Sequence, residues 1–264
     1  MGLMRNVLQA ALVLFALGGC ATVAPDYARE KRLADEITPA IVVGDAVQLV
    51  SVSGHRFLGI LTPVAKSRGG VLLVHGMGVH PDFGLIGALR SALADRGYTT
   101  LSIQMPVLAS DAKAEDYRPL FPEAGERIAA GLADLRARGL QKIAIVSHSM
   151  GARMVNDFFV HDLETRMKTS MTAYQPEVPI MAWVPVSISS GRLGSLAGVR
   201  FPVFDIFAEK DFEVVMHGAK SRASVLRGIK GSKQAMIYGA DHYFTGKEKD
   251  VASLIDQMLA PLSK

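Results

Sequence analysis

The stretch KIAIVSHSMGARM, residues 142–154, joins an apolar segment to a sharp polar turn. Residues 143–146 carry only apolar side chains, which predicts a strand buried on both faces. The turn that follows places Ser149 two residues before Gly151, and residues 151–163 have a spacing typical of a helix. A strand, a tight turn and a helix in this order would lift the Ser149 hydroxyl out of the sheet. Ser149 is therefore either a nucleophile or a turn residue that caps the helix.

Apolar segments alternate with amphipathic segments along the rest of the chain. This alternation predicts an α/β fold with a mostly parallel central sheet and helices on both faces. In such sheets, ligands bind beyond the carboxyl ends of the strands, so the residues that directly follow strands are the candidates for function. The expected strands are residues 47–52, 56–63, 70–74, 98–105, 143–146, 180–188, 203–208 and 235–238, and the expected helices are residues 85–96, 123–138, 151–163, 212–226 and 247–259.

The composition bounds both the size of the fold and the class of partner. The chain has 264 residues, of which 49% are hydrophobic, and this is enough for one sizeable α/β domain. The formal net charge is +4, and no basic stripe with interleaved aromatic residues is present, so we expect no nucleic-acid partner. No Gly-x-Gly-x-x-Gly or Walker loop, no cysteine pair and no His-Glu-x-x-His pattern occurs. We therefore expect neither a cofactor nor a metal site.

The N-terminus has the features of an export signal. Residues 7–17 form an apolar run that is too short to span a bilayer comfortably. The run ends in LGGC, residues 17–20, which resembles the bacterial lipobox, and this resemblance implies that Cys20 is acylated and becomes the first residue of the mature protein. Cys20 is also the only cysteine in the chain, and a lone free thiol would be unusual in an exported protein. The alternative is an ordinary signal peptide that contains a cysteine.

The resemblance to the lipobox sets the expected domain organisation and location. Residues 1–20 are expected to be a lipoprotein signal peptide, residues 21–45 a polar tether and residues 46–264 a single domain. The residue after Cys20 is Ala21, whereas an aspartate there would suggest retention in the inner membrane of enteric-type bacteria. We therefore expect a lipid-anchored protein of the bacterial cell envelope, at the outer membrane and facing the periplasm.

The turn after the strand at 143–146 resembles a known active-site motif. Its sequence SHSMG, residues 147–151, is similar to the Gly-x-Ser-x-Gly nucleophile elbow of the α/β-hydrolases, with Ser147 in place of the first glycine. The resemblance implies an α/β-hydrolase fold with Ser149 as the nucleophile. The N–H of Met150 would then lie at a helix N-terminus, where it can donate to an oxyanion. Few residues separate the sixth expected strand from Val203, so we expect a small lid or none.

The order of the motifs also resembles that of the α/β-hydrolases, in which the acid follows the serine and the histidine comes last. Asp211 follows the strand at 203–208 and is the expected acid, although it could instead cap the next helix. Glu209 is the second candidate, and Asp205, inside the strand, is a weaker one. The segment MIYGADHYF, residues 236–244, resembles the Gly-x-x-His loop that delivers the catalytic histidine. This makes His242 the expected base and acid, unless it is a solvated loop histidine, and makes Asp241 a turn or surface carboxylate.

The segment HGMGVHPDF, residues 75–83, resembles the His-Gly loop that supplies the second oxyanion donor. The backbone N–H of Met77 is the first choice for this donor and that of Gly78 the second, because glycines allow the backbone to approach the tetrahedral oxygen. We expect His75 to have a structural role that ties the loop down. His80 could line the mouth of the pocket.

The resemblance covers roughly residues 47–259, and the stretch from His75 to Ala109 is similar to an uncharacterised bacterial hydrolase-like lipoprotein family. It implies an envelope-associated serine hydrolase that cleaves a small or medium carboxylic ester or thioester through an acyl-enzyme. Two alternatives stay open at the level of sequence. One is a non-catalytic lipoprotein that uses the fold as a binding module, and the other is a peptidase or amidase with the same three residues.

Overall fold

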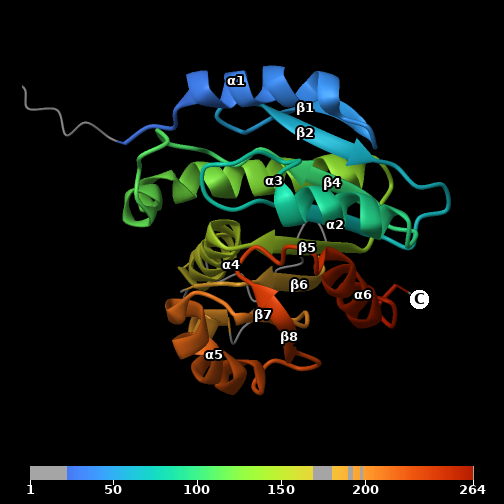
Figure 1. Ribbon diagram of the computed structural model, residues 1–264, viewed down its shortest axis with the longest axis vertical. Coiled ribbons are helices and arrows are strands. Elements are labelled where there is room, and N and C mark those ends of the chain that lie inside the picture. The colour runs from blue at the N-terminus through green and yellow to red at the C-terminus, as the bar shows by residue number, and fades with distance from the viewer. Residues whose placement is uncertain (1–22, 169–179, 190–192, 197–198, 264) are drawn as a thin grey trace, which may run out of the picture.

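The computed structural model describes residues 23–168, 180–189, 193–196 and 199–263 (Figure 1). Cys20 and the predicted signal peptide lie outside these residues, and so does the predicted site of acylation. Within the described residues, eight strands form a single sheet in the order β1-β2-β4-β3-β5-β6-β7-β8. Strand β2 runs antiparallel to its neighbours β1 and β4, and every other pairing is parallel. The sheet is therefore mostly parallel, as the sequence predicts.

The strands lie close to the segments that the apolar pattern indicates. Strand β5 runs on to His148 and β8 runs on to Asp241, so that Ser149 and His242 directly follow the ends of their strands. Both residues consequently lie at the carboxyl edge of the sheet. The bounds are β1 Asp45–Val50, β2 Arg56–Thr62, β3 Gly70–Val74, β4 Thr99–Ile103, β5 Ile143–His148, β6 Ile180–Val186, β7 Phe204–Lys210 and β8 Lys233–Asp241.

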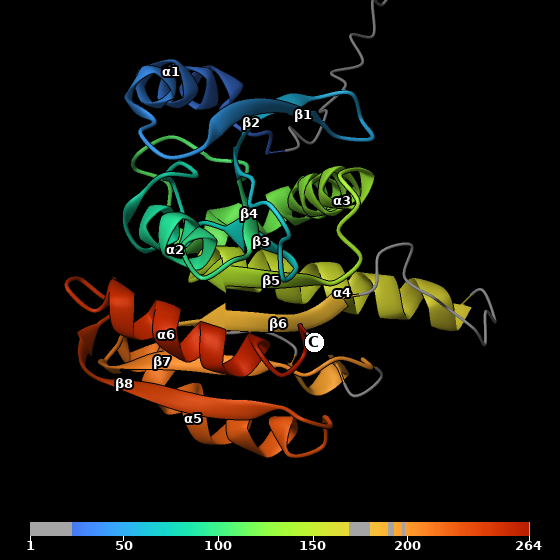
Figure 2. The same ribbon diagram turned by 90° about the vertical axis from the view of Figure 1, so that its right-hand side faces the viewer.

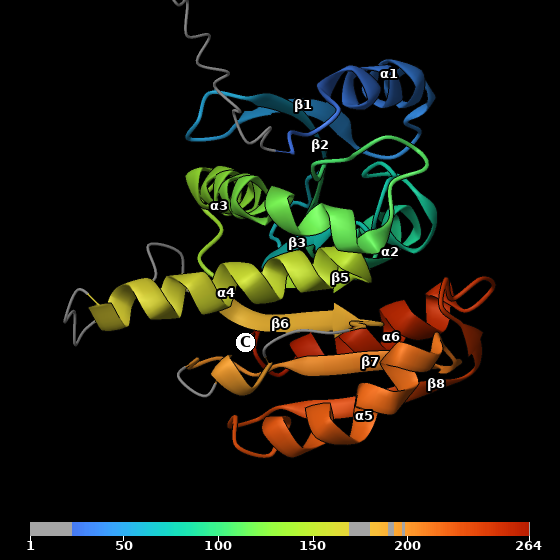
Figure 3. The ribbon, with the colours of Figure 1, turned by 90° about the vertical axis from the view of Figure 1, so that its left-hand side faces the viewer.

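Helices cover both faces of the sheet. One face is packed by α2, Gly84–Ala94, and α6, Glu248–Leu259 (Figure 2). The other face is packed by α3, Phe121–Ala137, α4, Met150–Lys168, and α5, Glu213–Leu226 (Figure 3). Each face has its own cluster of buried apolar side chains, because strands covered on both sides are apolar on both sides.

The N-terminal part of the domain corrects the prediction of a tether at 21–45. Residues 27–37 form helix α1, Tyr27–Ile37, which is followed by the 3₁₀ turn η1, Thr38–Ala40. The side chain of Asp26 caps α1 by accepting a hydrogen bond from Arg29 N at 2.8 Å. Glu30 is the one buried residue of α1, and its carboxylate pairs with Arg127 of α3 at 2.9 and 3.0 Å. The buried contacts of α1 are polar and reach residues far away in the sequence, so the local sequence does not indicate that this segment packs on the domain.

The links between elements leave little room for a lid. β6 ends at Val186 and β7 begins at Phe204, and the short 3₁₀ turn η3, Leu193–Leu196, lies between them. A second 3₁₀ segment, η2, Ala114–Leu120, precedes α3. Among the helices of the described residues, none is both long and apolar enough to cross a bilayer.

Candidate active site

The turn that carries Ser149 is held in a conformation that non-glycine residues rarely adopt. Ser149 has φ of +55°, and its N–H donates to the carbonyl of Val186 at 2.9 Å. Its own carbonyl accepts from Ala152 N at 3.0 Å, in the first turn of α4. The backbone on both sides of Ser149 is therefore fixed, which holds the residue in its uncommon conformation.

Glycine at 151 is required by a neighbouring strand rather than by Ser147. A Cβ atom added at Gly151 would lie 2.8 Å from the carbonyl oxygen of Val74 and closer still to that of His75. Helix α4 can approach the end of β3 only because this position has no side chain. Ser147, which replaces the first glycine of the motif, is buried, and its hydroxyl accepts a hydrogen bond from Trp183 Nε1 at 2.9 Å.

The structure brings Ser149, His242 and Asp211 together in one chain of hydrogen bonds. Nε2 of His242 lies 3.0 Å from Ser149 Oγ, and Nδ1 of His242 lies 2.6 Å from Asp211 Oδ1. A carboxylate can only accept, so Nδ1 carries the hydrogen and Nε2 is free to accept from the serine hydroxyl. This is the geometry in which a histidine can remove the proton of a serine.

Several donors hold the carboxylate of Asp211 in its ionised form. Burial favours the neutral acid, but hydrogen bonds from His242, from the Ser187 hydroxyl and from the N–H of Ala208 outweigh this effect and lower the pKa of Asp211. The N–H of Phe212 also donates to Asp211 Oδ1, at 2.9 Å. Asp211 is thus a fixed anion that orients the imidazole. Ser187 was not identified from the sequence, because the expected strand at 180–188 includes it, whereas β6 ends at Val186.

The structure places the other acidic candidates away from the imidazole. Glu209 Oε2 accepts from the N–H of Gly239 at 2.8 Å. Asp205 is buried inside β7 and accepts from Arg222 at 2.7 Å, and burial raises the pKa of its carboxyl group. Asp241 forms a turn by accepting from the N–H of Tyr243 at 3.0 Å. Among these carboxylates, Asp211 is the one that meets His242.

The imidazole of His242 is packed between other rings. Phe212 stacks on it with ring centroids 3.9 Å apart and an interplanar angle of 15°, and Tyr243 meets it edge-on at 5.3 Å. His148 lies below it, with ring centroids 5.1 Å apart, and donates from Nε2 to the carbonyl of His242 at 2.9 Å. Burial lowers the pKa of His148 to about 4, so His148 is neutral near pH 7. His148 could not be singled out from the sequence, because the residue that it contacts, His242, belongs to a loop far away in the chain.

The loop after β3 runs beside the serine. A Cβ built on Gly76 would lie 3.5 Å from Ser149 Cβ, so the residue that directly precedes Met77 lies beside Ser149. Gly78 has φ of +71°, a conformation that favours glycine. Met150 is the first residue of α4, so its N–H belongs to the helical turn that has no acceptor within the helix. The predicted oxyanion donors therefore belong to two backbone segments that flank Ser149.

His75 ties this loop to the neighbouring strand, as expected from the sequence. Its Nδ1 donates to the carbonyl of Gly76 at 2.7 Å, and its Nε2 accepts from the N–H of Met105 at 2.9 Å. Burial lowers the pKa of His75 to about 3, which keeps the ring in the neutral form that these two bonds require. In a trans peptide the C=O and the next N–H point in opposite directions. The bond from His75 to the Gly76 carbonyl therefore turns the N–H of Met77 the other way.

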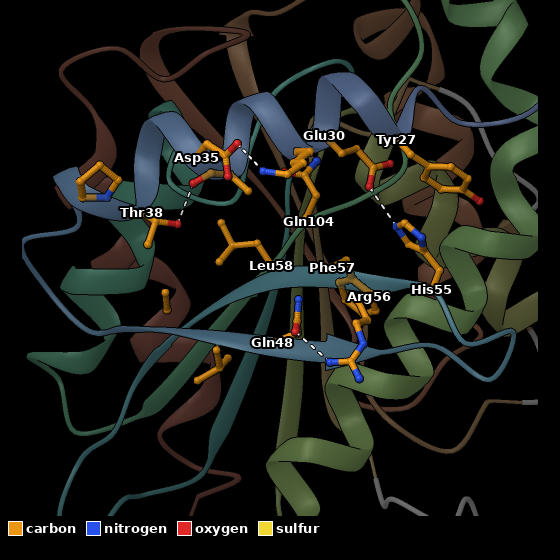
Figure 4. A pocket seen from close by; sticks show the side chains of 15 residues that line it. Tyr27, Glu30, Asp35, Thr38, Gln48, His55, Arg56, Phe57, Leu58 and Gln104 are labelled. Carbon is orange, nitrogen blue, oxygen red and sulfur yellow. Dashed lines mark hydrogen bonds and ion pairs between the residues drawn. The ribbon is translucent and has the colours of Figure 1, made fainter.

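A separate groove of about 780 Å³ lies between α1 and the β1–β2 hairpin (Figure 4). Its lining mixes charged side chains, such as Glu30 and Arg56, with apolar ones, such as Leu58. Ser149, His242 and Asp211 are not among the residues that line it. No group of three or more metal-ligating side chains occurs among the described residues.

The strand order and the solved structures that resemble the chain define the α/β-hydrolase fold. An alpha-beta serine hydrolase homologue from Coxiella burnetii is 14% identical, over 83% of this chain and 99% of that chain, with a TM-score of 0.60. A dienelactone hydrolase from Anabaena variabilis is 19% identical, over 82% and 98%, with a TM-score of 0.59. A Xanthomonas campestris protein described as an a/b serine hydrolase without lid is 14% identical, over 84% and 95%, with a TM-score of 0.57. The names of these neighbours agree with a hydrolase in general.

The match to a sequence family covers less of the chain than the matches to solved structures do. A family model described as "Protein of unknown function (DUF3530)" matches residues 22–125. The matched stretch contains α1, the β1–β2 hairpin and the loop after β3, and it ends before Ser149. No curated protein matches the chain in sequence.

Proposed function

We propose that the protein is a serine hydrolase that cleaves a carboxylic ester or thioester through an acyl-enzyme. The observation that carries this proposal is the chain of hydrogen bonds from Ser149 Oγ to His242 Nε2, at 3.0 Å, and from His242 Nδ1 to Asp211, at 2.6 Å. These hydrogen bonds lie at the carboxyl edge of the mostly parallel sheet, which is where ligands bind in folds of this kind.

In the proposed first step, Ser149 Oγ attacks the substrate carbonyl carbon while its proton passes to His242 Nε2. The oxyanion that forms accepts from the N–H groups of Met150 and Met77, with Gly78 as the second choice in the loop. His242 then donates the proton to the leaving alcohol or thiol, and the acyl group stays on Ser149. Water attacks the acyl-enzyme by the same sequence, and Asp211 stabilises the imidazolium in both halves.

The surroundings of the site favour a small or medium acyl group. The exposed apolar side chains Met77, Phe212 and Tyr243 are 40%, 49% and 56% exposed, and they belong to the loops that carry the oxyanion residues, Asp211 and His242, respectively. Apolar contacts of this kind suit an acyl or aromatic portion of a substrate. The short link between β6 and β7 agrees with a site that is open rather than covered.

The test is covalent labelling with a fluorophosphonate probe. We expect the folded wild type to be labelled and the Ser149→Ala variant to remain unlabelled. An unchanged melting temperature of the variant shows that it is folded. Ester and thioester turnover should disappear in the same variant. A folded wild type that is neither labelled nor active would instead favour the binding module, and turnover of amides at a rate equal to that of esters would favour the peptidase or amidase.

We also propose that Cys20 carries a lipid anchor that holds the domain in the bacterial envelope, at the outer membrane and facing the periplasm. The sequence LGGC at residues 17–20 and the absence of any other cysteine support this proposal. Mass spectrometry of the protein from a bacterial envelope fraction should show an acylated Cys20. A Cys20→Ala variant that remains lipidated would contradict it.

A further inference from the structure

We propose that Arg29 is a positioning residue for the oxyanion loop, and that α1 is thereby part of the active-site assembly although it lies outside the hydrolase sheet. This inference rests on the proposed function, since it assigns a role in the reaction to a residue that does not touch Ser149 or His242. It is carried by the contacts of one guanidinium with two loops at the carboxyl edge of the sheet.

Arg29 joins the loop after β3 to the segment after β4. Its Nη2 donates to the carbonyl of Gly78 at 2.8 Å, and its Nη1 donates to the carbonyl of Leu108 at 2.6 Å. Both acceptors are backbone atoms, so the bonds fix the course of the main chain rather than a side chain. A planar guanidinium presents two donors in a rigid fork and can hold two carbonyls at once.

The bond to Gly78 completes a set of three side-chain bonds that hold the loop. The carbonyl of Gly76 accepts from His75 at 2.7 Å, and that of Val79 accepts from Gln104 at 3.2 Å. The carbonyl of Gly78, between them, accepts from Arg29. The N–H of Met77 shares a peptide plane with the carbonyl of Gly76, and the N–H of Gly78 lies in the next plane, between the two planes that His75 and Arg29 hold. The carbonyl of Gly78 shares its plane with the N–H of Val79, so the Arg29 bond fixes the peptide plane that directly follows the two candidate donors. Arg29 thus limits the rotation of Gly78, the residue that joins this plane to the plane of the Gly78 N–H.

Gly78 depends on this support more than an ordinary loop residue would. Its φ of +71° belongs to a region that only glycine occupies freely, and glycine is also the residue with the most freedom to leave it. The Arg29 guanidinium and the Tyr117 hydroxyl lie within 3.8 Å of the place where a Cβ would be, so they enclose the glycine. Removing the guanidinium would leave the loop free to populate other conformations, most of which misalign the amides.

The rest of α1 holds Arg29 in place. Glu30, the next residue, is 5% exposed and forms a bidentate pair with Arg127 of α3. The N–H of Asp26 donates to the carbonyl of Val107 at 2.8 Å. The position of Arg29 is therefore set from both sides, by contacts that do not involve the oxyanion loop. Helix α1 can therefore hold the Arg29 side chain in place independently of the loop that this side chain contacts.

The experiment compares Arg29→Lys and Arg29→Ala with Lys31→Ala, measuring the rate of fluorophosphonate labelling, kcat and KM for p-nitrophenyl acetate, and Tm. Lys31 lies on the same helix, and among the described residues it pairs with the exposed Asp35, so its loss should change none of these. Losing an oxyanion donor slows catalysis by about 100- to 1000-fold, and a misaligned donor should cost less. We expect labelling and kcat to fall about tenfold or more in both Arg29 variants, with KM little changed. Added guanidinium should restore part of the rate to Arg29→Ala.

The outcomes separate this inference from the proposed function. If the wild type and both Arg29 variants are labelled at the same rate, Arg29 has no positioning role, while the serine hydrolase stands. If rate and Tm fall together in Arg29→Lys as well as Arg29→Ala, and guanidinium restores nothing, Arg29 only stabilises the fold and the inference is overturned. A wild type that is not labelled at all refutes the proposed function, and the positioning role with it.

Discussion

Glu209 and Asp211 are two residues apart on the same strand end, yet they bind different parts of the segment that carries His242. Glu209 accepts from the backbone of Gly239, whereas Asp211 accepts from the imidazole itself. Asp211 also receives bonds from Ser187 and from two backbone N–H groups, which leave its carboxylate one orientation. The fixed carboxylate at Nδ1 of His242 selects the tautomer that carries its hydrogen on Nδ1.

We therefore expect Asp211→Asn to lower the rate of turnover far more than Glu209→Gln does. An asparagine can favour the wrong tautomer of His242, and a change of this kind costs about 10⁴-fold in kcat in serine enzymes. Glu209→Gln keeps an oxygen that can accept from Gly239, so its turnover of p-nitrophenyl acetate should stay within a few-fold of the wild type. A larger loss in Glu209→Gln than in Asp211→Asn would reassign the acid.

At the level of elements, the turn at Ser149 depends on how closely α4 approaches the end of β3. Gly151 is in contact with the last carbonyls of that strand, and a Cβ has no space there because the neighbouring atoms are backbone. Gly125 in α3 offers a matched comparison. A Cβ at Gly125 would meet only the side chain of Phe158, at 3.6 Å, which is an ordinary van der Waals contact.

Gly151→Ala should consequently lower the free energy of unfolding by about 1–3 kcal/mol, the usual cost of overpacking, and should slow fluorophosphonate labelling. Gly125→Ala should be neutral or should stabilise the protein by up to about 1 kcal/mol, since alanine is the better helix former. Urea denaturation of the two variants measures both effects. Equal behaviour of the two would mean that the helix can move away from β3 without consequence.

The sequence predicts the elements whose side chains follow a regular apolar pattern and misses those held by polar contacts. GVLLV at residues 70–74 is apolar throughout, and β3 has these bounds. Helix α1 was expected to be a tether, because its buried residue is Glu30 and the partner of Glu30 is 97 residues away in the sequence. The same reason applies within the site. Motif order locates Ser149 and His242, whereas a residue such as Ser187 or His148 gains its role only from a tertiary contact.

At the scale of the whole molecule, the site is supported by two buried neutral histidines from different strands. His75 follows β3 and holds the oxyanion loop, and His148 ends β5 and holds the backbone of His242. Burial lowers the pKa of His75 to about 3 and that of His148 to about 4, from an ordinary value of 6.5. In the unfolded chain both would take up a proton near pH 6.5. Acid therefore favours the unfolded state.

The direction of the pH dependence follows from this difference. The contribution of each histidine to the free energy of unfolding is complete above pH 6.5. It is lost as the pH falls toward the folded pKa values, at about 1.4 kcal/mol per pH unit for each histidine. Between pH 7.5 and pH 5 the free energy of unfolding should fall by about 2 kcal/mol for each histidine. Urea denaturation at several pH values measures the slope.

The His148→Gln variant separates the contribution of His148 to the pH dependence from that of His75. Glutamine can still donate to the carbonyl of His242 but does not titrate, so the variant should lose about half of the histidine-dependent slope between pH 6.5 and pH 5. An unchanged slope in His148→Gln, or a wild type whose stability is flat over this range, would contradict the assignment of His148 as a buried neutral ring.

The order of the strands along the chain also governs when the serine meets its base during biosynthesis. Ser149 follows β5, but His242 arrives only after β8, which forms the far edge of the sheet. A ribosome therefore completes the hydroxyl-bearing half well before the imidazole emerges from the exit tunnel. A nascent or truncated chain without β8 lacks the imidazole that the proposed mechanism requires. In the proposed mechanism, Ser149 can therefore act as a nucleophile only after β8, the last strand of the described residues, has been translated.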